Sequence, residues 1–70
     1  MAYPFEKIDF TKEALGKEYE SCVFSQCNFV GVNLSNVKFS ECEFVNCNMS
    51  NVVVTNTALR DITFRDCKLL

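Results

Sequence analysis

The stretch SQCNFVGVNLSNVKFSECEFVNCNMSNVVV, from Ser25 to Val54, brings a large apolar residue back at every fifth position. The period continues on both sides of the stretch. The large residues, termed central here, are Tyr19, Phe24, Phe29, Leu34, Phe39, Phe44, Met49, Val54, Leu59, Phe64 and Leu69. Two residues before each of them from Phe24 on lies a second, smaller set: Cys22, Cys27, Val32, Val37, Cys42, Cys47, Val52, Thr57, Ile62 and Cys67.

A period of five fits neither a regular helix nor a regular strand. An amphipathic helix repeats its apolar residues at spacings of three and four, and a strand repeats them at two. Both apolar sets can face one axis only if the chain turns once in every unit. Asn or Asp, which tolerate left-handed backbone, often stand two places after the central residue, at Asn36, Asn46, Asn51, Asn56, Asp61 and Asp66. The pattern predicts a coil of short extended pieces joined by corners.

These units resemble the pentapeptide-repeat family, whose consensus is A-(D/N)-L-x-x, over residues 17–70. The resemblance implies an all-β fold, a right-handed quadrilateral β-helix with four units in each coil. The chain would then form a solenoid of about two and a half coils, in which residues twenty apart stack. Phe24, Phe44 and Phe64 would share one wall, and Cys27 would stack with Cys47 and Cys67.

The two ends of the chain differ. Residues 1–16 are out of register, and we expect them to cap the first coil as a strand and a loop. A short helix from Lys12 to Lys17, with Thr11 as its N-cap, is the alternative. The repeat of residues 17–70 runs on to the last residue without a cap. We therefore expect either the N-terminal part of a longer solenoid or self-association through the open C-terminal coil, most simply as a homodimer.

The five cysteines are the one group of residues that could hold a metal. Cys22 with Cys27 and Cys42 with Cys47 could be two halves of a four-thiolate zinc site, although a spacing of four is loose for such a site. Disulfides are a further alternative. We favour thiols that serve as small apolar core residues, and predict no metal and no cofactor. The chain has no histidine, and its paired acids should face solvent. We therefore predict no catalytic residues and no enzymatic activity.

The composition of the chain indicates its cellular location and excludes some classes of binding partner. The net charge is only −2, with both signs mixed along the chain, so we predict no direct contact with nucleic acid. No apolar run is long enough for a membrane span, and the first residues do not look like a secretory signal. An odd number of cysteines without such a signal indicates reduced thiols and a cytoplasmic location. A solid column would also leave no cavity for a small-molecule substrate.

The function that fits these features is a structural or protein-interaction module whose partner is unknown. The resemblance offers an alternative. The segment of residues 15–29 looks like the opening of a subgroup that mimics DNA. Members of that subgroup bind DNA gyrase or topoisomerase IV and protect the cell from quinolones or toxins. That role would make a type II topoisomerase the partner, and it would need negative potential along the column.

Overall fold

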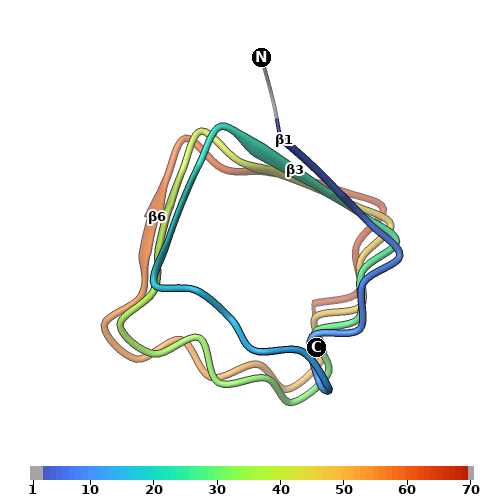
Figure 1. The fold of residues 1–70 in the computed structure, drawn as a ribbon, viewed down its shortest axis with the longest axis horizontal. Coiled ribbons are helices and arrows are strands. Elements are labelled where there is room, and N and C mark those ends of the chain that lie inside the picture. The colour runs from blue at the N-terminus through green and yellow to red at the C-terminus, as the bar shows by residue number, and fades with distance from the viewer. Residues whose placement is uncertain (1–2, 70) are drawn as a thin grey trace.

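The computed structural model describes residues 3–69, which form seven short strands and no helix. The strands are β1 (Tyr3–Glu6), β2 (Glu18–Glu20), β3 (Cys22–Ser25), β4 (Lys38–Ser40), β5 (Glu43–Val45), β6 (Ala58–Arg60) and β7 (Thr63–Arg65). Seen end-on, the chain winds around a four-sided column (Figure 1). The predicted all-β solenoid is confirmed.

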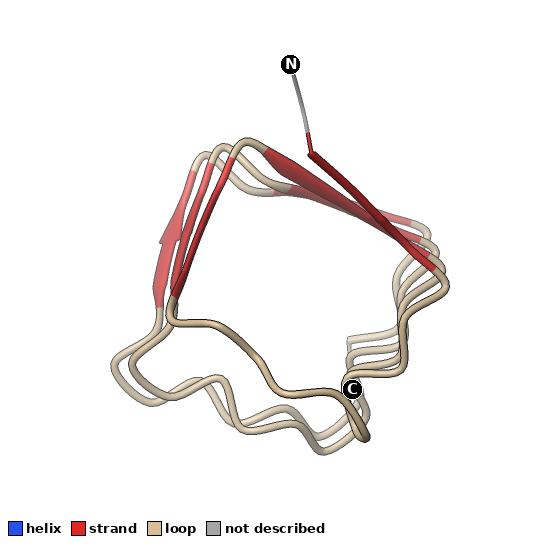
Figure 2. Ribbon diagram, viewed as in Figure 1, coloured by secondary structure: helices blue, strands red, loops and turns tan. Residues whose placement is uncertain are grey.

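Two of the four walls are parallel sheets (Figure 2). One sheet has the order β1-β3-β5-β7 and the other the order β2-β4-β6. Phe24 pairs with Phe44, and Phe44 with Phe64, so residues twenty apart stack as predicted. Since one wall is crossed four times, the chain makes about three turns. It runs clockwise as it recedes from the N-terminal end in Figure 1, which makes the coil right-handed.

The other two walls, termed bridge walls, contain no strand within the described residues. Isolated parallel bridges hold them: Asp9 to Asn28, Asn28 to Asn48 and Asn48 to Lys68 on one wall, and Asn33 to Val53 on the other. These pairs place the central residues that follow them one above another. The four walls predicted from a twenty-residue turn are therefore all present.

Asparagine favours the bend at three positions of the bridge walls, and Val53 and Lys68 of the last turn take the same place without it. The side-chain Oδ1 atoms of Asn28, Asn33 and Asn48 each accept a hydrogen bond from a backbone amide two residues further on, at 3.0, 2.9 and 3.2 Å. This Asx turn offers the backbone an alternative to a strand. The equivalent positions of the sheet walls hold no Asn, so the chain stays extended there long enough to pair.

The corners have left-handed backbone at every fifth residue. Positive φ angles of 52° to 67° occur at Ser21, Gln26, Gly31, Asn36, Glu41, Asn46, Asn51, Asn56, Asp61 and Asp66. In the bridge walls the corner residue is always Gly or Asn. There the amide of Val32 donates to the carbonyl of Phe29 at 3.0 Å, which closes a β-turn around Gly31. A positive φ at the third position of such a turn selects Gly or Asn, which accounts for these residue types.

Aromatic rings fill the interior. Phe24 stacks on Phe5 below and on Phe44 above, with ring centroids 4.9 and 4.8 Å apart. Rings on neighbouring walls meet edge to face, as Phe29 does with Phe24 at 5.7 Å and with Phe44 at 5.8 Å. Stacked rings within a wall and edge contacts between walls are both favourable geometries. The core is therefore continuous along the axis and across it.

The N-terminal segment is built as the first turn of the column. Tyr3 of β1 pairs with Cys22 of β3, an offset of nineteen residues in place of twenty. Phe5 and Phe10 stack on Phe24 and Phe29, at 4.9 and 4.7 Å. Since the first turn is one residue short, it runs inside the later turns along one bridge wall (Figure 1).

The N-terminal segment is a strand followed by a loop, and the alternative helix from Lys12 to Lys17 does not form. Thr11 does not act as an N-cap acceptor. Its amide instead donates to the Oδ1 atom of Asp9 at 3.0 Å, and its hydroxyl donates to the same atom. Asp9 therefore holds the bend that begins the loop.

Candidate interaction surfaces

The central side chains that other turns cover on both sides are deeply buried. Phe24, Phe29, Phe39 and Phe44 have no exposed surface, and Leu34 and Met49 have 1% and 5%. Tyr19 is half-buried near the N-terminal end. The remaining central residues, Val54, Leu59, Phe64 and Leu69, belong to the last turn and are exposed. In this turn the central residues have no covering layer among the described residues.

The second inward set lies beside the central residues. Cys22, Cys27, Val37, Cys42 and Cys47 are buried. Val32, Val52, Thr57, Ile62 and Cys67 are half-buried. This set therefore lines the same column, and its exposure also rises toward the last turn.

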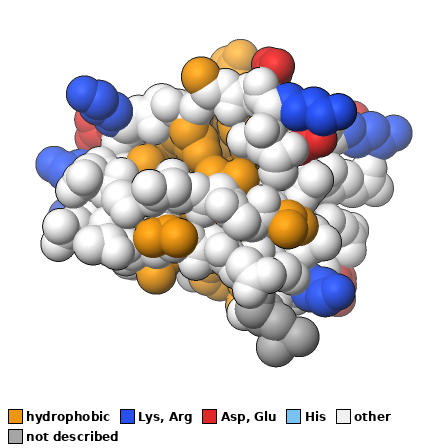
Figure 3. Space-filling model, turned by 90° about the horizontal axis from the view of Figure 1, so that it is seen from below, with side chains coloured by type: hydrophobic (Ala, Val, Ile, Leu, Met, Phe, Trp, Pro, Cys, Tyr) orange, Lys and Arg blue, Asp and Glu red, His pale blue; other side chains and the backbone are white. Residues whose placement is uncertain are grey.

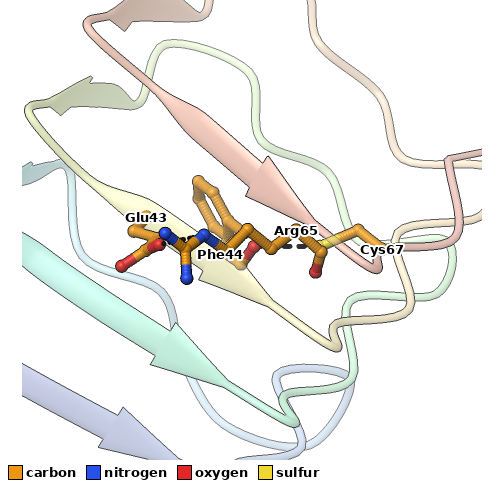
Figure 4. A network of polar contacts seen from close by, with 4 residues as sticks. All are labelled: Glu43, Phe44, Arg65 and Cys67. Atoms are coloured by element: carbon orange, nitrogen blue, oxygen red, sulfur yellow. Dashed lines mark hydrogen bonds and ion pairs between the residues drawn. The ribbon is translucent and has the colours of Figure 1, made fainter.

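Cysteine and threonine have a specific role in the second set, which is to donate to a carbonyl of the turn below. The Sγ atom of Cys47 donates to the carbonyl of Phe24 at 3.2 Å, and that of Cys67 to the carbonyl of Phe44 at 3.1 Å (Figure 4). The hydroxyl of Thr57 donates to the carbonyl of Leu34 at 2.7 Å. A thiol is a small apolar group with a weak donor, so it can fill the slot and still satisfy a carbonyl.

The thiols are free, and burial disfavours their ionised form. All five cysteines are unbridged, and among residues 3–69 no three His, Cys, Asp or Glu side chains gather in a way that could hold a metal. Burial raises the pKa of Cys47 to about 11, and it also raises the pKa of Cys22 and Cys27. Because the thiolate is the nucleophile and the metal ligand, these three groups are poorly suited to either chemistry.

The sheet walls carry charges of both signs. Glu18 of β2 stands opposite Lys38 of β4. On the other sheet wall, the Nε atom of Arg65 lies 3.0 Å from the Oε2 atom of Glu43 (Figure 4). An exposed pair of this kind contributes little to stability, about 0.2–1 kcal/mol. The effect of such pairs is to break up any continuous acidic stripe along these walls.

The bridge walls, by contrast, are free of charge over two successive turns. Residues 28–36 and 48–56 include no Asp, Glu, Lys or Arg. Their outward side chains, termed the uncharged face, are Asn28, Val30, Asn33, Ser35, Asn36, Asn48, Ser50, Asn51, Val53, Thr55 and Asn56. Figure 3 shows the wall of Asn33 and Val53, with charged groups only toward the margins of the view. Val30 and Val53 are 38% and 44% exposed, so this face is polar but not strongly hydrated throughout.

The last turn leaves an apolar end, termed the open end, formed by Val54, Leu59, Phe64 and Leu69. These four side chains are 39% to 57% exposed. They surround a hollow of about 150 Å³ whose floor includes Leu34, Phe39, Phe44 and Met49. No further turn among the described residues covers this floor, so the hollow is open at this end of the column.

The backbone at the open end also offers hydrogen-bonding groups. The amides of Ala58 and Thr63 donate back to the previous turn, to the carbonyls of Val37 and Cys42, at 3.0 and 3.1 Å. Successive residues of a strand direct their amides to opposite sides. The amides of Leu59 and Phe64 therefore point away from the previous turn, along the axis of the column. The open end is therefore a sheet edge and an apolar patch at once.

Sequence reasoning missed that the first turn belongs to the column. Phe5, Phe10 and Leu15 pack against the core, and Phe10 is only 7% exposed. The signal was available, since these three residues have the same spacing of five. It was hidden because only three residues lie between Leu15 and Tyr19, one fewer than between successive central residues, which shifts the register by one.

The comparisons with known proteins agree with this geometry. A family model described as "Pentapeptide repeat region" matches residues 17–70. A search of curated proteins finds no match, so the assignment rests on the repeat itself. The described residues 3–69 contain no helix long and apolar enough to cross a membrane. The match covers more than half of the chain, and its repeats form the observed column, so the chain belongs to the pentapeptide-repeat family.

Proposed function

We propose that this chain is a non-enzymatic interaction module that binds a protein partner through the uncharged face. The observation that carries the proposal is the separation of surface types. Charges of both signs lie on the sheet walls, whereas residues 28–36 and 48–56 on the bridge walls have none. The cores of protein–protein interfaces are likewise depleted in charged residues.

The rigidity of the column supports the same proposal. Stacked rings such as Phe24 and Phe44 fix each turn on its neighbour, and Asx turns fix the bends beneath the uncharged face. A preorganised surface loses little conformational freedom on binding. Neutral amide and hydroxyl groups can both donate and accept, and their desolvation costs less than that of charges.

The alternative partner, a type II topoisomerase bound in place of DNA, gains no support from these walls. A DNA mimic needs a continuous negative potential, but Lys38 stands between Glu18 and Ala58, and Arg65 forms an ion pair with Glu43.

We also propose that the protein works in the reducing environment of the cytoplasm. Its five cysteines are all free, and thiols stay reduced in that compartment.

Partner capture with two matched threonine variants tests the proposed face. Thr55 lies on the uncharged face and Thr63 on a sheet wall, and both are exposed. We expect immobilised wild-type protein and Thr63→Lys to retain the same protein from a cell extract. Thr55→Lys should lose it, since a charge on this face must be desolvated on binding. Melting curves check that both variants fold. Equal retention by the two variants, or loss with Thr63→Lys alone, would refute the uncharged face as the binding surface.

A further inference from the structure

We propose that a backbone ledge beside the uncharged face binds an extended segment of the protein partner. The ledge consists of four groups of the second turn: the carbonyls of Val30, Asn33 and Ser35 and the amide of Asn33. This inference rests on the proposed function and deepens it, because it states which part of the partner is bound and through which contacts. Addition of an extended segment to a free backbone edge is a recurrent mode of peptide recognition.

The third turn shows how such groups are used when a neighbouring turn covers them. Three amides of the second turn donate to its carbonyls: Gly31 to Ser50 at 2.9 Å, Leu34 to Val53 at 2.8 Å and Asn36 to Thr55 at 3.1 Å. In return, the amide of Val53 donates to the carbonyl of Val32 at 3.1 Å. Along this wall each turn therefore offers three acceptors and one donor, and the turn before it supplies the complement.

The same four groups of the second turn lack this complement. Twenty residues earlier, they fall at Val30, Asn33 and Ser35. Within residues 3–69, no backbone hydrogen bond joins residues 11–16, termed the inner loop, to residues 30–36. On either side the turns are bonded as usual, by the amide of Phe10 to the carbonyl of Asn28 and by that of Lys38 to the carbonyl of Lys17, both at 2.9 Å. The ledge is therefore confined to one stretch of the bridge walls.

The short first turn is the cause of this interruption. Three residues lie between Leu15 and Tyr19, whereas four lie between Leu34 and Phe39, so the corner residue Asn36 has no counterpart in the first turn. The inner loop cuts across this corner, inside the later turns (Figure 1).

The amides of the inner loop also have other partners. Those of Lys12 and Glu13 donate to the carbonyl of Asp9, both at 3.1 Å, and that of Gly16 donates to the hydroxyl of Tyr19 at 2.7 Å. The ledge is therefore part of the folded structure, and the inner loop does not compete for it.

An extended peptide backbone is the occupant whose chemistry fits the ledge. Its amides and carbonyls alternate along one edge, so it can supply donors to three carbonyls and accept from one amide. Phosphates and ionised carboxylates have only acceptor oxygens to offer, so a row of carbonyls disfavours them. Val30, Asn33 and Ser35 also belong to the uncharged face, and Val30 and Asn33 are exposed. A protein bound to that face therefore lies beside the ledge.

A variant that completes the first turn tests this assignment. Insertion of one Asn between Gly16 and Lys17 supplies the missing corner, and Lys12→Gly sets glycine beneath the corner of Gly31. The inner loop of this double variant can then pair with the ledge and occupy it. We expect the double variant to retain the protein captured from the extract roughly tenfold less well than the wild type, the loss of one or two net hydrogen bonds. Lys12→Gly alone leaves the ledge free and should retain that protein fully.

Amide hydrogen exchange of Asn33, followed by NMR, reports directly on the ledge. In the free wild type this amide should exchange rapidly, whereas the amide of Val53, which donates to the turn below, should be protected. The Asn33 amide should become protected in the double variant. It should also become protected in the wild type when the captured protein is added, a measurement that does not depend on the folding of any variant.

Two results would overturn the ledge alone: rapid exchange of Asn33 in the wild-type complex, or full retention of the captured protein by a double variant whose Asn33 amide is protected. In either case, loss of that protein with Thr55→Lys would still support the uncharged face. Equal retention by Thr55→Lys and Thr63→Lys, or no retained protein at all, would remove the proposed function and the ledge together. The failures of the two proposals are therefore distinguishable.

Discussion

Phe44 and Phe64 lie in adjacent turns of one wall with their rings nearly parallel, 15° between planes and 5.3 Å between centroids. They pair in register as neighbours in β5 and β7. Yet Phe44 has no exposed surface, while Phe64 is 39% exposed. The two residues occupy the same place in the repeat, so the difference between them isolates the effect of a covering turn.

Replacing each of these two phenylalanines by alanine should give different losses of stability. Phe44→Ala leaves a cavity between Phe24 and Phe64 and removes edge contacts with Phe29 and Phe39. We expect a loss of about 3–5 kcal/mol. Phe64→Ala should cost less, about 1–2 kcal/mol, because much of that ring is already in water. Urea denaturation of the variants at a fixed low protein concentration measures both. Equal losses would show that the last turn is covered in solution.

Gly31 tests the backbone of the corners. Its φ is 67°, and a Cβ atom there would meet no atom within 4 Å. Gly31→Ala should therefore cost about 1–2 kcal/mol from left-handed backbone strain alone. Gly31→Asn should cost less, since Asn holds the equivalent corners at Asn36, Asn51 and Asn56. Thermal melts of the two variants make the comparison. A larger loss with Asn than with Ala would rule out the backbone explanation.

Asn48 tests the Asx turn. Its Oδ1 atom accepts from the amide of Ser50 at 3.2 Å and from the hydroxyl of Ser50 at 2.9 Å. Asn48→Ala should lower the unfolding free energy by about 0.5–1.5 kcal/mol, the net contribution of such bonds. Asn48→Asp keeps the acceptor and serves as the control. If the Asp variant is as unstable as the Ala variant, the side-chain acceptor is not what stabilises this bend.

The buried thiols predict a loss of stability in alkaline solution. Burial raises the pKa of Cys47 from 9.0 to about 11. A raised pKa in the folded state means that folding favours the neutral thiol. The contribution to stability is complete below pH 9.0 and is lost as the pH rises through about 11.

Melting temperatures measured across this pH window check the effect, with Cys47→Ala as the comparison. The slope against pH should be shallower in the variant than in the wild type. It should not vanish, because burial also raises the pKa of Cys22 and Cys27. An unchanged slope in Cys47→Ala would mean that this thiol does not titrate differently in the two states.

Most of the column follows from the spacing of one kind of residue. A large apolar residue returns at every fifth position, as at Phe24, Phe29 and Leu34, and this spacing requires one corner in each five-residue unit. The division into four walls came from family resemblance, since spacing does not fix how many units complete a coil. Asn before the central residue marks a bridge wall at Asn28, Asn33 and Asn48, where its side chain favours a bend, but Val53 and Lys68 occupy the same place in the bridge walls without it.

Other features depend on contacts that spacing does not encode. The hydrogen bonds from Cys47 and Cys67 to carbonyls of the turn below follow from the stacking of turns. The hollow at the open end depends on what covers the last turn. The uncharged face combines two sequence segments that become neighbours only when the coil closes. Its members were identifiable by residue type, and their adjacency followed from the family resemblance, which implied that residues twenty apart stack.

The register of the turns sets which changes of chain length the protein can absorb. Between β3 and β7 every layer repeats after twenty residues. An insertion or deletion of twenty residues there would lengthen or shorten the column and leave every stacked pair intact. A change of five would rotate all later residues by a quarter turn, which would set phenylalanine wall against asparagine wall. Only insertions or deletions of twenty residues, or a multiple of twenty, therefore preserve the stacking in this part of the chain. The first turn has nineteen residues, so it differs in register from the later turns and could not replace one of them.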